Sequence, residues 1–149
     1  MSNESWTWST ERTIASRRGA GRETIDEVLE QLSAQHWSQR DIFSVRLALE
    51  EAICNAISHG NCLDCNKQVR FHCRVSPTRF WAQVEDEGSG FDPNKVPDCT
   101  DTEHIDVPGG RGVMLIKSFM NRVCYNDIGN VVEMEKFRTP CEPGSNCCP

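Results

Sequence analysis

Apolar residues in the first part of the chain recur every three or four positions, in two separate segments. This spacing places them on one face of an α-helix. In the first segment, residues 22–36, that face consists of Ile25, Val28, Leu29 and Leu32. In the second it consists of Ile42, Val45, Leu49, Ala52, Ile53, Ala56 and Ile57. Ser38 and Asp41 resemble a capping box before the second face, and Gly60 follows it where glycine favours a helix end. The pattern predicts two amphipathic helices, the second about six turns long.

Apolar and polar residues alternate in several other segments, which is typical of strands with one buried face. The alternation predicts an edge strand and two hairpins, at residues 6–14, 69–75 with 80–84, and 122–126 with 131–137. A short helix is expected from Val113 to Met120. This order of elements predicts an α/β two-layer sandwich, with a mixed, mostly antiparallel sheet and helices on one face.

The 149 residues are enough for one domain with a sizeable core. We expect this domain to span residues 1–138 and to be followed by a flexible tail, residues 139–149, which contains two prolines and a glycine. Between Glu87 and Gly112 the chain is rich in glycine and proline and poor in apolar residues. Because loops of this length in compact domains are usually functional, we predict a lid over about Pro93 to Pro108.

Charge and hydropathy exclude several classes of function. The formal net charge is -6, and lysine and arginine never form a run, which argues against a nucleic-acid-binding surface. No apolar stretch approaches the ~18 residues of a membrane span. The N-terminal residues lack the pattern of a secretory signal. The expected location is therefore the cytoplasm.

The nine cysteines do not form the pattern of a disulfide framework. Three of them fall in expected core elements: Cys54, Cys73 and Cys124. Near the end of the second helix, zinc ligands are available from His59, Cys62 and Cys65, with a fourth from His72 or Cys73. His72 and Cys73 adjoin on a strand and face opposite sides, so this ligand set is incomplete. We therefore interpret Cys62 and Cys65, and the tail pair Cys147 and Cys148, as surface thiols.

One polar motif lies on the second helix. Glu51 and Asn55 are four residues apart and fall on one side, away from the apolar face. Such a pair is ordinary on a solvated face. Its carboxylate and amide oxygens are also the hard ligands that Mg²⁺ takes.

A second motif, Asp86-x-Gly88-x-Gly90, directly follows a predicted strand. Most such sequences are turns. Alternatively, a buried carboxylate here can accept a hydrogen bond from an exocyclic amine such as that of adenine, while glycine lets the ring approach the backbone.

The third motif, Gly109-Gly110-Arg111-Gly112, opens the short helix. One interpretation is a flexible joint. The other is a phosphate site, because unpaired N–H groups at a helix N-terminus bind anions and the guanidinium of Arg111 matches phosphate oxygens. It is neither a Walker loop nor the dinucleotide-binding fingerprint.

Together the three motifs resemble the N, G1 and G2 boxes of the GHKL ATPases, the class of gyrase B, histidine kinases and MutL. The segments EEAICNAISHGN, VEDEGSGFDP and GGRGVMLIKSFMNRV are most similar to anti-sigma-factor serine/threonine kinases of the RsbW and SpoIIAB type. The resemblance covers about residues 6–138. It implies an ATPase fold of the histidine-kinase type, with ATP between the helix layer and the lid.

The resemblance also implies roles for individual residues. Asn55 would coordinate Mg²⁺, Asp86 would bind the adenine amine, and Glu51 would be the general base. The pocket around ATP would be shaped by Gly88, Gly90, Gly110, Arg111 and Gly112. One departure is Pro108, which stands where some members carry an arginine that contacts phosphate.

Two functions follow from the resemblance. The first is a kinase that phosphorylates an antagonist protein on serine or threonine and sequesters a sigma factor. The second is a nucleotide-responsive partner switch with little or no phosphotransfer. The resemblance also allows a homodimer. Glu51 favours the kinase, because a pure binding module needs no carboxylate at the γ-phosphate.

Overall fold

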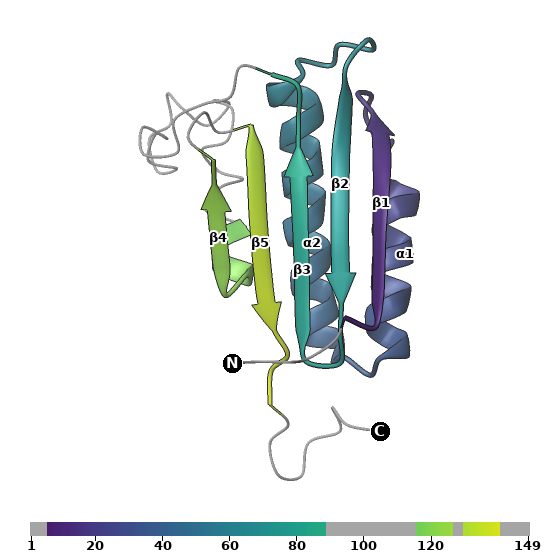
Figure 1. Cartoon of the computed structure of the whole chain (residues 1–149), viewed down its shortest axis with the longest axis vertical. Coiled ribbons are helices and arrows are strands. Elements are labelled where there is room, and N and C mark those ends of the chain that lie inside the picture. Colours follow the sequence, from purple (N-terminus) through teal and green to yellow (C-terminus); the bar gives the residue numbers. More distant parts are fainter. Residues whose placement is uncertain (1–5, 89–115, 127–129, 141–149) are drawn as a thin grey trace.

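The computed structural model describes residues 6–88, 116–126 and 130–140 (Figure 1). Its centre is a five-stranded sheet in the order β1-β2-β3-β5-β4. The strands are β1 (Trp8–Ala15), β2 (Gln68–Val75), β3 (Arg79–Glu85), β4 (Arg122–Tyr125) and β5 (Val131–Phe137). Every pairing in this sheet is antiparallel. The prediction of a mixed sheet is therefore wrong for the described strands, because each neighbouring pair runs in opposite directions.

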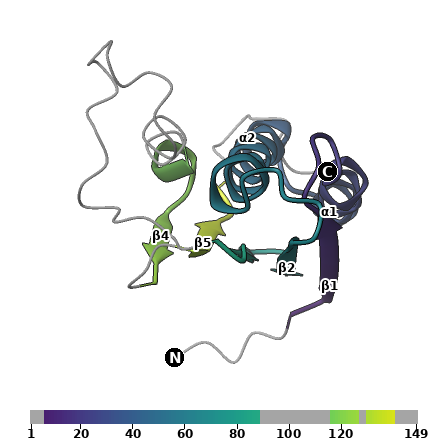
Figure 2. The same ribbon diagram turned by 90° about the horizontal axis from the view of Figure 1, so that it is seen from above.

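Helices cover one face of the sheet (Figure 2). They are α1 (Arg22–Ala34), α2 (Gln39–Asn55) and a π-helical turn, η1 (Ala56–Gly60), with a further helical segment at residues 116–119. The first helix begins and ends within two residues of its predicted bounds. The predicted second helix is divided into α2 and η1, which together end at Gly60. The predicted α/β sandwich with helices on one face is confirmed. No described helix is long and apolar enough to cross a bilayer.

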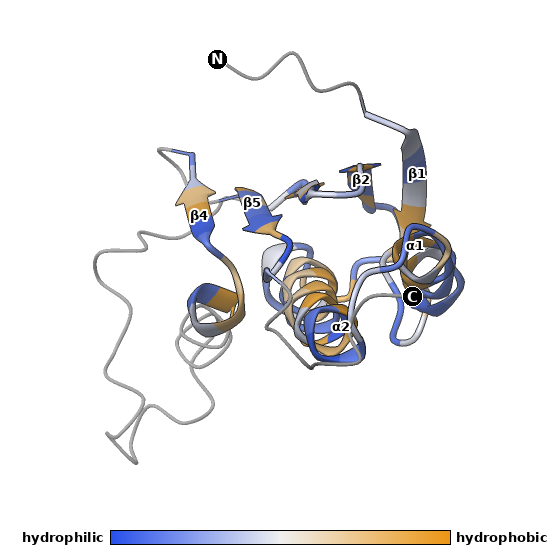
Figure 3. Ribbon diagram, turned by 90° about the horizontal axis from the view of Figure 1, so that it is seen from below, coloured by the Kyte–Doolittle hydropathy of each residue, from blue (hydrophilic) through white to orange (hydrophobic). Residues whose placement is uncertain are grey.

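The core lies between the helices and the inner face of the sheet. Alternate residues of β2 and β3 point into it, and the apolar side of α2 faces them (Figure 3). The largest fully buried side chains are Phe71, Phe80, Leu32, Leu49, Ile116 and Met134. Cys73 belongs to this core as predicted, but Cys54 and Cys124 are exposed. The core prediction is wrong for these two, because Cys54 lies outside the apolar face of α2 and Cys124 points to the outer face of edge strand β4.

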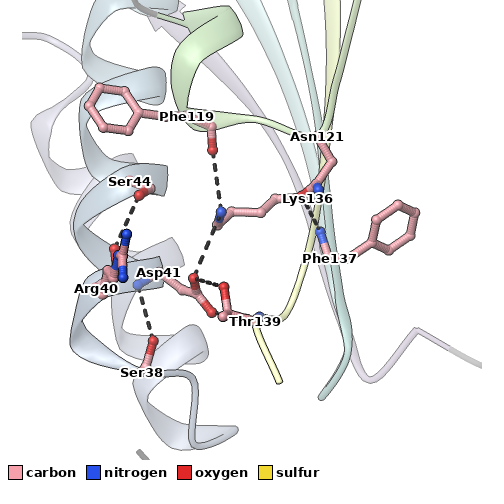
Figure 4. Close-up of polar contacts among 9 residues, drawn as sticks. All are labelled: Ser38, Arg40, Asp41, Ser44, Phe119, Asn121, Lys136, Phe137 and Thr139. Atoms are coloured by element: carbon pink, nitrogen blue, oxygen red, sulfur yellow. Dashed lines mark hydrogen bonds and ion pairs between the residues drawn. The ribbon is translucent and has the colours of Figure 1, made fainter. Parts of the chain in front are cut away.

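The start of α2 is held to the end of β5 and to the residues that follow this strand (Figure 4). Ser38 caps the helix, since its Oγ accepts the Asp41 N–H at 3.2 Å. The Asp41 carboxylate is buried and accepts hydrogen bonds from the N–H of Thr139 at 2.9 Å and from its hydroxyl at 2.7 Å. Lys136 Nζ lies 3.7 Å from Asp41 and also donates to the carbonyl of Phe119 at 3.4 Å. The folded part thus extends to Thr139, while residues 141–149 of the predicted tail lie outside the described residues.

Candidate functional site

The first motif lies at the C-terminal end of α2. Glu51 and Asn55 are one turn apart and half-buried, and Asn55 is the last residue of the helix. The Nδ2 atom of Asn55 is buried and has no hydrogen-bond partner among the described residues. A buried amide without a partner is costly in a folded protein. Asn55 therefore presents a polar group that a ligand could satisfy.

A π-helical turn carries the chain from Asn55 to Gly60. The Asn61 N–H donates to the carbonyl of Ala56 at 2.8 Å, the i to i−5 bond of this wider turn. Single π-turns inside or after α-helices occur frequently at functional sites. Gly60 lies five residues after Asn55, so the helical stretch ends about one turn beyond the first motif.

Gly60 meets the second motif in direct contact. An added Cβ on Gly60 would lie 2.2 Å from Asp86 Oδ2, and one on Gly88 would lie 1.9 Å from the Gly60 carbonyl oxygen. Only residues without a side chain can approach this closely. The backbone of Gly60 is not left-handed, because Gly19 is the glycine with positive φ in the described part of the chain. The helical stretch ends at Gly60, as predicted, but without the left-handed backbone that favours glycine at a helix end, so close contact with Asp86 is the reason for glycine here.

Asp86 directly follows β3 and is 9% exposed. Burial raises the pKa of its carboxyl group, and a 2.8 Å hydrogen bond from the Gly88 N–H to Oδ1 offsets part of this shift. The second oxygen, Oδ2, accepts no hydrogen bond from the described residues. Oδ2 is thus a desolvated acceptor beside two glycines. An amine on a flat ring could donate a hydrogen bond to it without meeting a side chain.

Two asparagines missed by the sequence analysis hold the backbone around Asp86. The Asn130 carbonyl accepts the Asp86 N–H at 2.9 Å, and its Nδ2 donates to the Asp86 carbonyl at 3.1 Å. On the other side, Asn61 Oδ1 accepts the Glu87 N–H at 2.7 Å. In the sequence, Asn130 belongs to a turn between two predicted strands. Asn61 follows the second predicted helix and belongs to no periodic pattern. Neither role could have been assigned from the sequence, because Glu87 lies 26 residues from Asn61 and Asp86 lies 44 residues from Asn130.

The remaining predicted site residues lie outside the described residues: Gly90, Gly110, Arg111 and Gly112. The predicted lid, about Pro93 to Pro108, also falls there. The described helical segment at residues 116–119 lies within the short helix that the sequence predicts from Val113 to Met120. The structure therefore places the second motif against Gly60, five residues beyond Asn55, and leaves the third motif as a prediction.

Several hollows are lined by described residues, and of the following three none is lined by both Asn55 and Asp86. One of about 840 Å³ lies between α1 and the α2–η1 segment. One of about 390 Å³ opens on the outer sheet face. One of about 200 Å³ borders the Asp86 turn beside Arg70 and Asn130. We place the candidate site by the contact of Gly60 with Asp86 rather than by the volume of a hollow, because none of these hollows is lined by both Asn55 and Asp86.

Side chains that hold metals do not cluster in the described part of the chain, where no three His, Cys, Asp or Glu side chains form a metal site. His72 lies on the outer sheet face and Cys73 is buried, as the alternation along β2 predicts. Cys62 and Cys65 are exposed.

The model of the histidine kinase-like ATPase domain matches residues 14–136, which is most of the chain. The chain belongs to this family. The resemblance predicted from the three motifs is thereby confirmed. Within the histidine kinase-like ATPase family, known relatives include kinases. The serine-protein kinase RsbW of Oceanobacillus iheyensis is 25% identical over 126 residues, 80% of this chain and 78% of the relative.

Two other relatives are matched over shorter stretches. The serine/threonine-protein kinase BtrW of Bordetella bronchiseptica is 26% identical over 60% of this chain and 64% of its own length. The serine-protein kinase RsbW of Staphylococcus aureus is 28% identical over 65% of this chain and 66% of its own length. The match thus spans just under two thirds of each of these relatives.

A solved structure shares the fold. The crystal structure of the RsbU and RsbW domains of Rv1364c from Mycobacterium tuberculosis superimposes with a TM-score of 0.62, covering 91% of this chain and 34% of that one. Its sequence identity is 15%, so this likeness supports the fold of the ATPase domain and no residue's role.

Proposed function

We propose that this protein is an ATP-dependent serine/threonine kinase of the anti-sigma-factor type. The observation that carries the proposal is the contact of Gly60 with Asp86, which sets a desolvated carboxylate against the end of the helix that bears Asn55 and Glu51. Relatives named serine-protein kinases support the same activity.

The described residues fit the adenine ring and the Mg²⁺ ion of Mg·ATP. Oδ2 of Asp86 would accept the exocyclic amine of adenine, and Gly60 and Gly88 leave the carboxylate and backbone free of side chains. The unpaired amide of Asn55 suits a cation, because turning the amide over presents Oδ1 in place of Nδ2. Bound Mg²⁺ neutralises charge on the phosphates. Further phosphate contacts would come from Gly90, Gly110, Arg111 and Gly112.

Glu51 is the proposed general base. It lies one turn before Asn55 on the same side of α2, so it would face the phosphate end of the nucleotide. There its carboxylate would accept the proton of a substrate hydroxyl as that oxygen attacks the γ-phosphate. The substrate would be a serine or threonine of an antagonist protein. The second partner would be a sigma factor, held when the antagonist is absent, in the cytoplasm.

A matched pair of glutamates tests the proposal. Glu51→Ala should keep its affinity for Mg·ATP and lose phosphotransfer by about 10²- to 10⁴-fold, because a base acts on the incoming hydroxyl. Glu50→Ala is the control, since Glu50 is exposed, pairs with Arg46 at 3.6 Å and lies on another side of the same helix. The substrate for the assay comes from pull-down in native lysate with and without ATP, followed by phosphosite mapping. ATP binding without phosphate on any recovered partner would support the partner switch instead.

A further inference from the structure

The side chain of Asn61 is completely buried, at 0% exposure, directly after Gly60. Its amide makes three hydrogen bonds. Nδ2 donates to Ser16 Oγ at 2.7 Å and to the carbonyl of Gln68 at 3.0 Å, and Oδ1 accepts the N–H of Glu87 at 2.7 Å. Every hydrogen of the amide group and one lone pair of its oxygen are therefore used. Buried polar networks that are fully satisfied in this way hold one arrangement of the chain.

The chemistry of the partners fixes the orientation of this amide. The Gln68 carbonyl can only accept, and the Glu87 N–H can only donate, so Nδ2 and Oδ1 cannot exchange places. A carboxylate would put a second acceptor against Gln68, and an apolar side chain would leave both backbone groups unsatisfied. Position 61 thus requires a group with an acceptor and two donors, which an amide supplies.

The three bonds join segments that are far apart in the sequence. Ser16 follows the end of β1, Gln68 begins β2, and Glu87 follows Asp86 at the end of β3. A second link supports the same arrangement, because the Glu87 carboxylate accepts the Gln68 N–H. The peptide group between Asp86 and Glu87 is therefore tied to the end of the helix on one side, while Asn130 holds Asp86 on the other.

We propose that Asn61 is a positioning residue for nucleotide selection: its bond to the Glu87 N–H fixes Asp86 where the carboxylate distinguishes adenine from guanine. This inference rests on the proposed ATP binding and concerns a residue outside the three motifs. Adenine presents an amine to Asp86, and guanine presents a carbonyl oxygen that repels it. Displacing Asp86 weakens the ATP complex, which loses a hydrogen bond, and does not weaken the GTP complex, which makes none there and is relieved of the repulsion.

The test measures Mg·ATP and Mg·GTP affinities by calorimetry at low temperature, with folding checked by circular dichroism. Asn61→Ala should lower the ATP-to-GTP affinity ratio by about tenfold, mostly through weaker ATP binding. Ser16→Ala is the matched control. It removes a buried partner of the same amide and lowers stability, yet keeps the bond to Glu87, so its ratio should equal that of the wild type. A ratio unchanged in Asn61→Ala, or lowered equally in Ser16→Ala, overturns the inference.

A second measurement needs no variant. The Glu87 side chain is exposed, but its N–H bonds to a fully buried oxygen. Amide hydrogen exchange on nucleotide-free wild type should therefore find the Glu87 N–H protected. Fast exchange at this amide would overturn the inference even if Asn61→Ala does not fold. If wild-type protein shows no preference for ATP over GTP, the proposed base recognition by Asp86 fails, whatever the exchange at Glu87.

Discussion

Replacing Gly60 with alanine should damage nucleotide binding while leaving the fold intact. The new Cβ would lie 2.2 Å from Asp86 Oδ2, whereas ordinary contact begins at 3.4 Å, so the carboxylate must move by about 1.2 Å. Asp86 Cγ at 2.3 Å and Oδ1 at 2.7 Å are obstructed as well, so the side chain must move as a whole, while alanine is a better helix former than glycine by about 1 kcal/mol. We therefore expect the free energy of unfolding to fall by about 1–2 kcal/mol. The lost hydrogen bond to adenine involves a charged group, which corresponds to about 1.5–3 kcal/mol, or roughly ten- to hundredfold in ATP affinity.

Calorimetric titration with Mg·ATP, paired with urea unfolding, measures both quantities. Gly19→Ala is the control, because Gly19 has φ +81° and open space around it. Alanine there costs about 1–2 kcal/mol of backbone strain without touching Asp86, so stability should fall and ATP affinity should stay. Wild-type ATP affinity in Gly60→Ala would refute the placement of the adenine site at Asp86. A loss of several kcal/mol in stability would refute the argument that only a side chain is displaced.

Three further predictions concern charge and exposure. Because burial raises the Asp86 pKa above its ordinary 3.8, this group favours the folded state most below that value, and the benefit declines as pH rises through the folded pKa. Asp86→Asn should therefore raise the melting temperature at about pH 7 but not at about pH 3, while losing ATP binding in calorimetry. Asp41→Ala should lower the unfolding free energy by about 2 kcal/mol or more in urea, since it leaves Thr139 and Lys136 without their buried partner. The exposed Glu50→Ala should cost under about 0.5 kcal/mol in the same assay. A thiol reagent should reach Cys73 only after unfolding and should react quickly, in the native protein, with Cys54, Cys62, Cys65 and Cys124.

The periodic part of the fold could be predicted because periodicity reports burial. The stripe of α2 and the alternation in β2 and β3 correspond to side chains that are buried in the structure. The prediction that failed, for Cys54 and Cys124, rested on residue type instead. Both are cysteines placed in the core by residue type, yet one lies beside the apolar stripe and the other at an outward position of a four-residue edge strand. The place of each residue in the helical or strand repeat predicted its burial better than the usual preference of cysteine for the interior.

Polar contacts could not be predicted in the same way, because their partners lie far away in the sequence. The Ser38 cap was recognisable, since its bond spans three residues. Asp41 seemed to complete that cap, but its carboxylate binds Thr139, 98 residues later. The amide of Asn61 likewise reaches residues from three strand ends. Short-range patterns therefore identified candidate residues, and only the fold showed which of them meet.

Gly60 and Gly88 illustrate both kinds of prediction, from local sequence patterns and from contacts that only the fold shows. Each glycine has a local explanation, a helix end and a turn, and each explanation is incomplete, because Asp86 excludes a side chain on Gly60 and the Gly60 carbonyl excludes one on Gly88. The Asp86 carboxylate is buried beside them, and this burial disfavours its charged form in the absence of a ligand. A donor that approaches Oδ2 would offset that cost, so the arrangement gains most from a ligand carrying an amine. The destabilised carboxylate is thus the physical link between the packing of the helix end and the proposed preference for adenine.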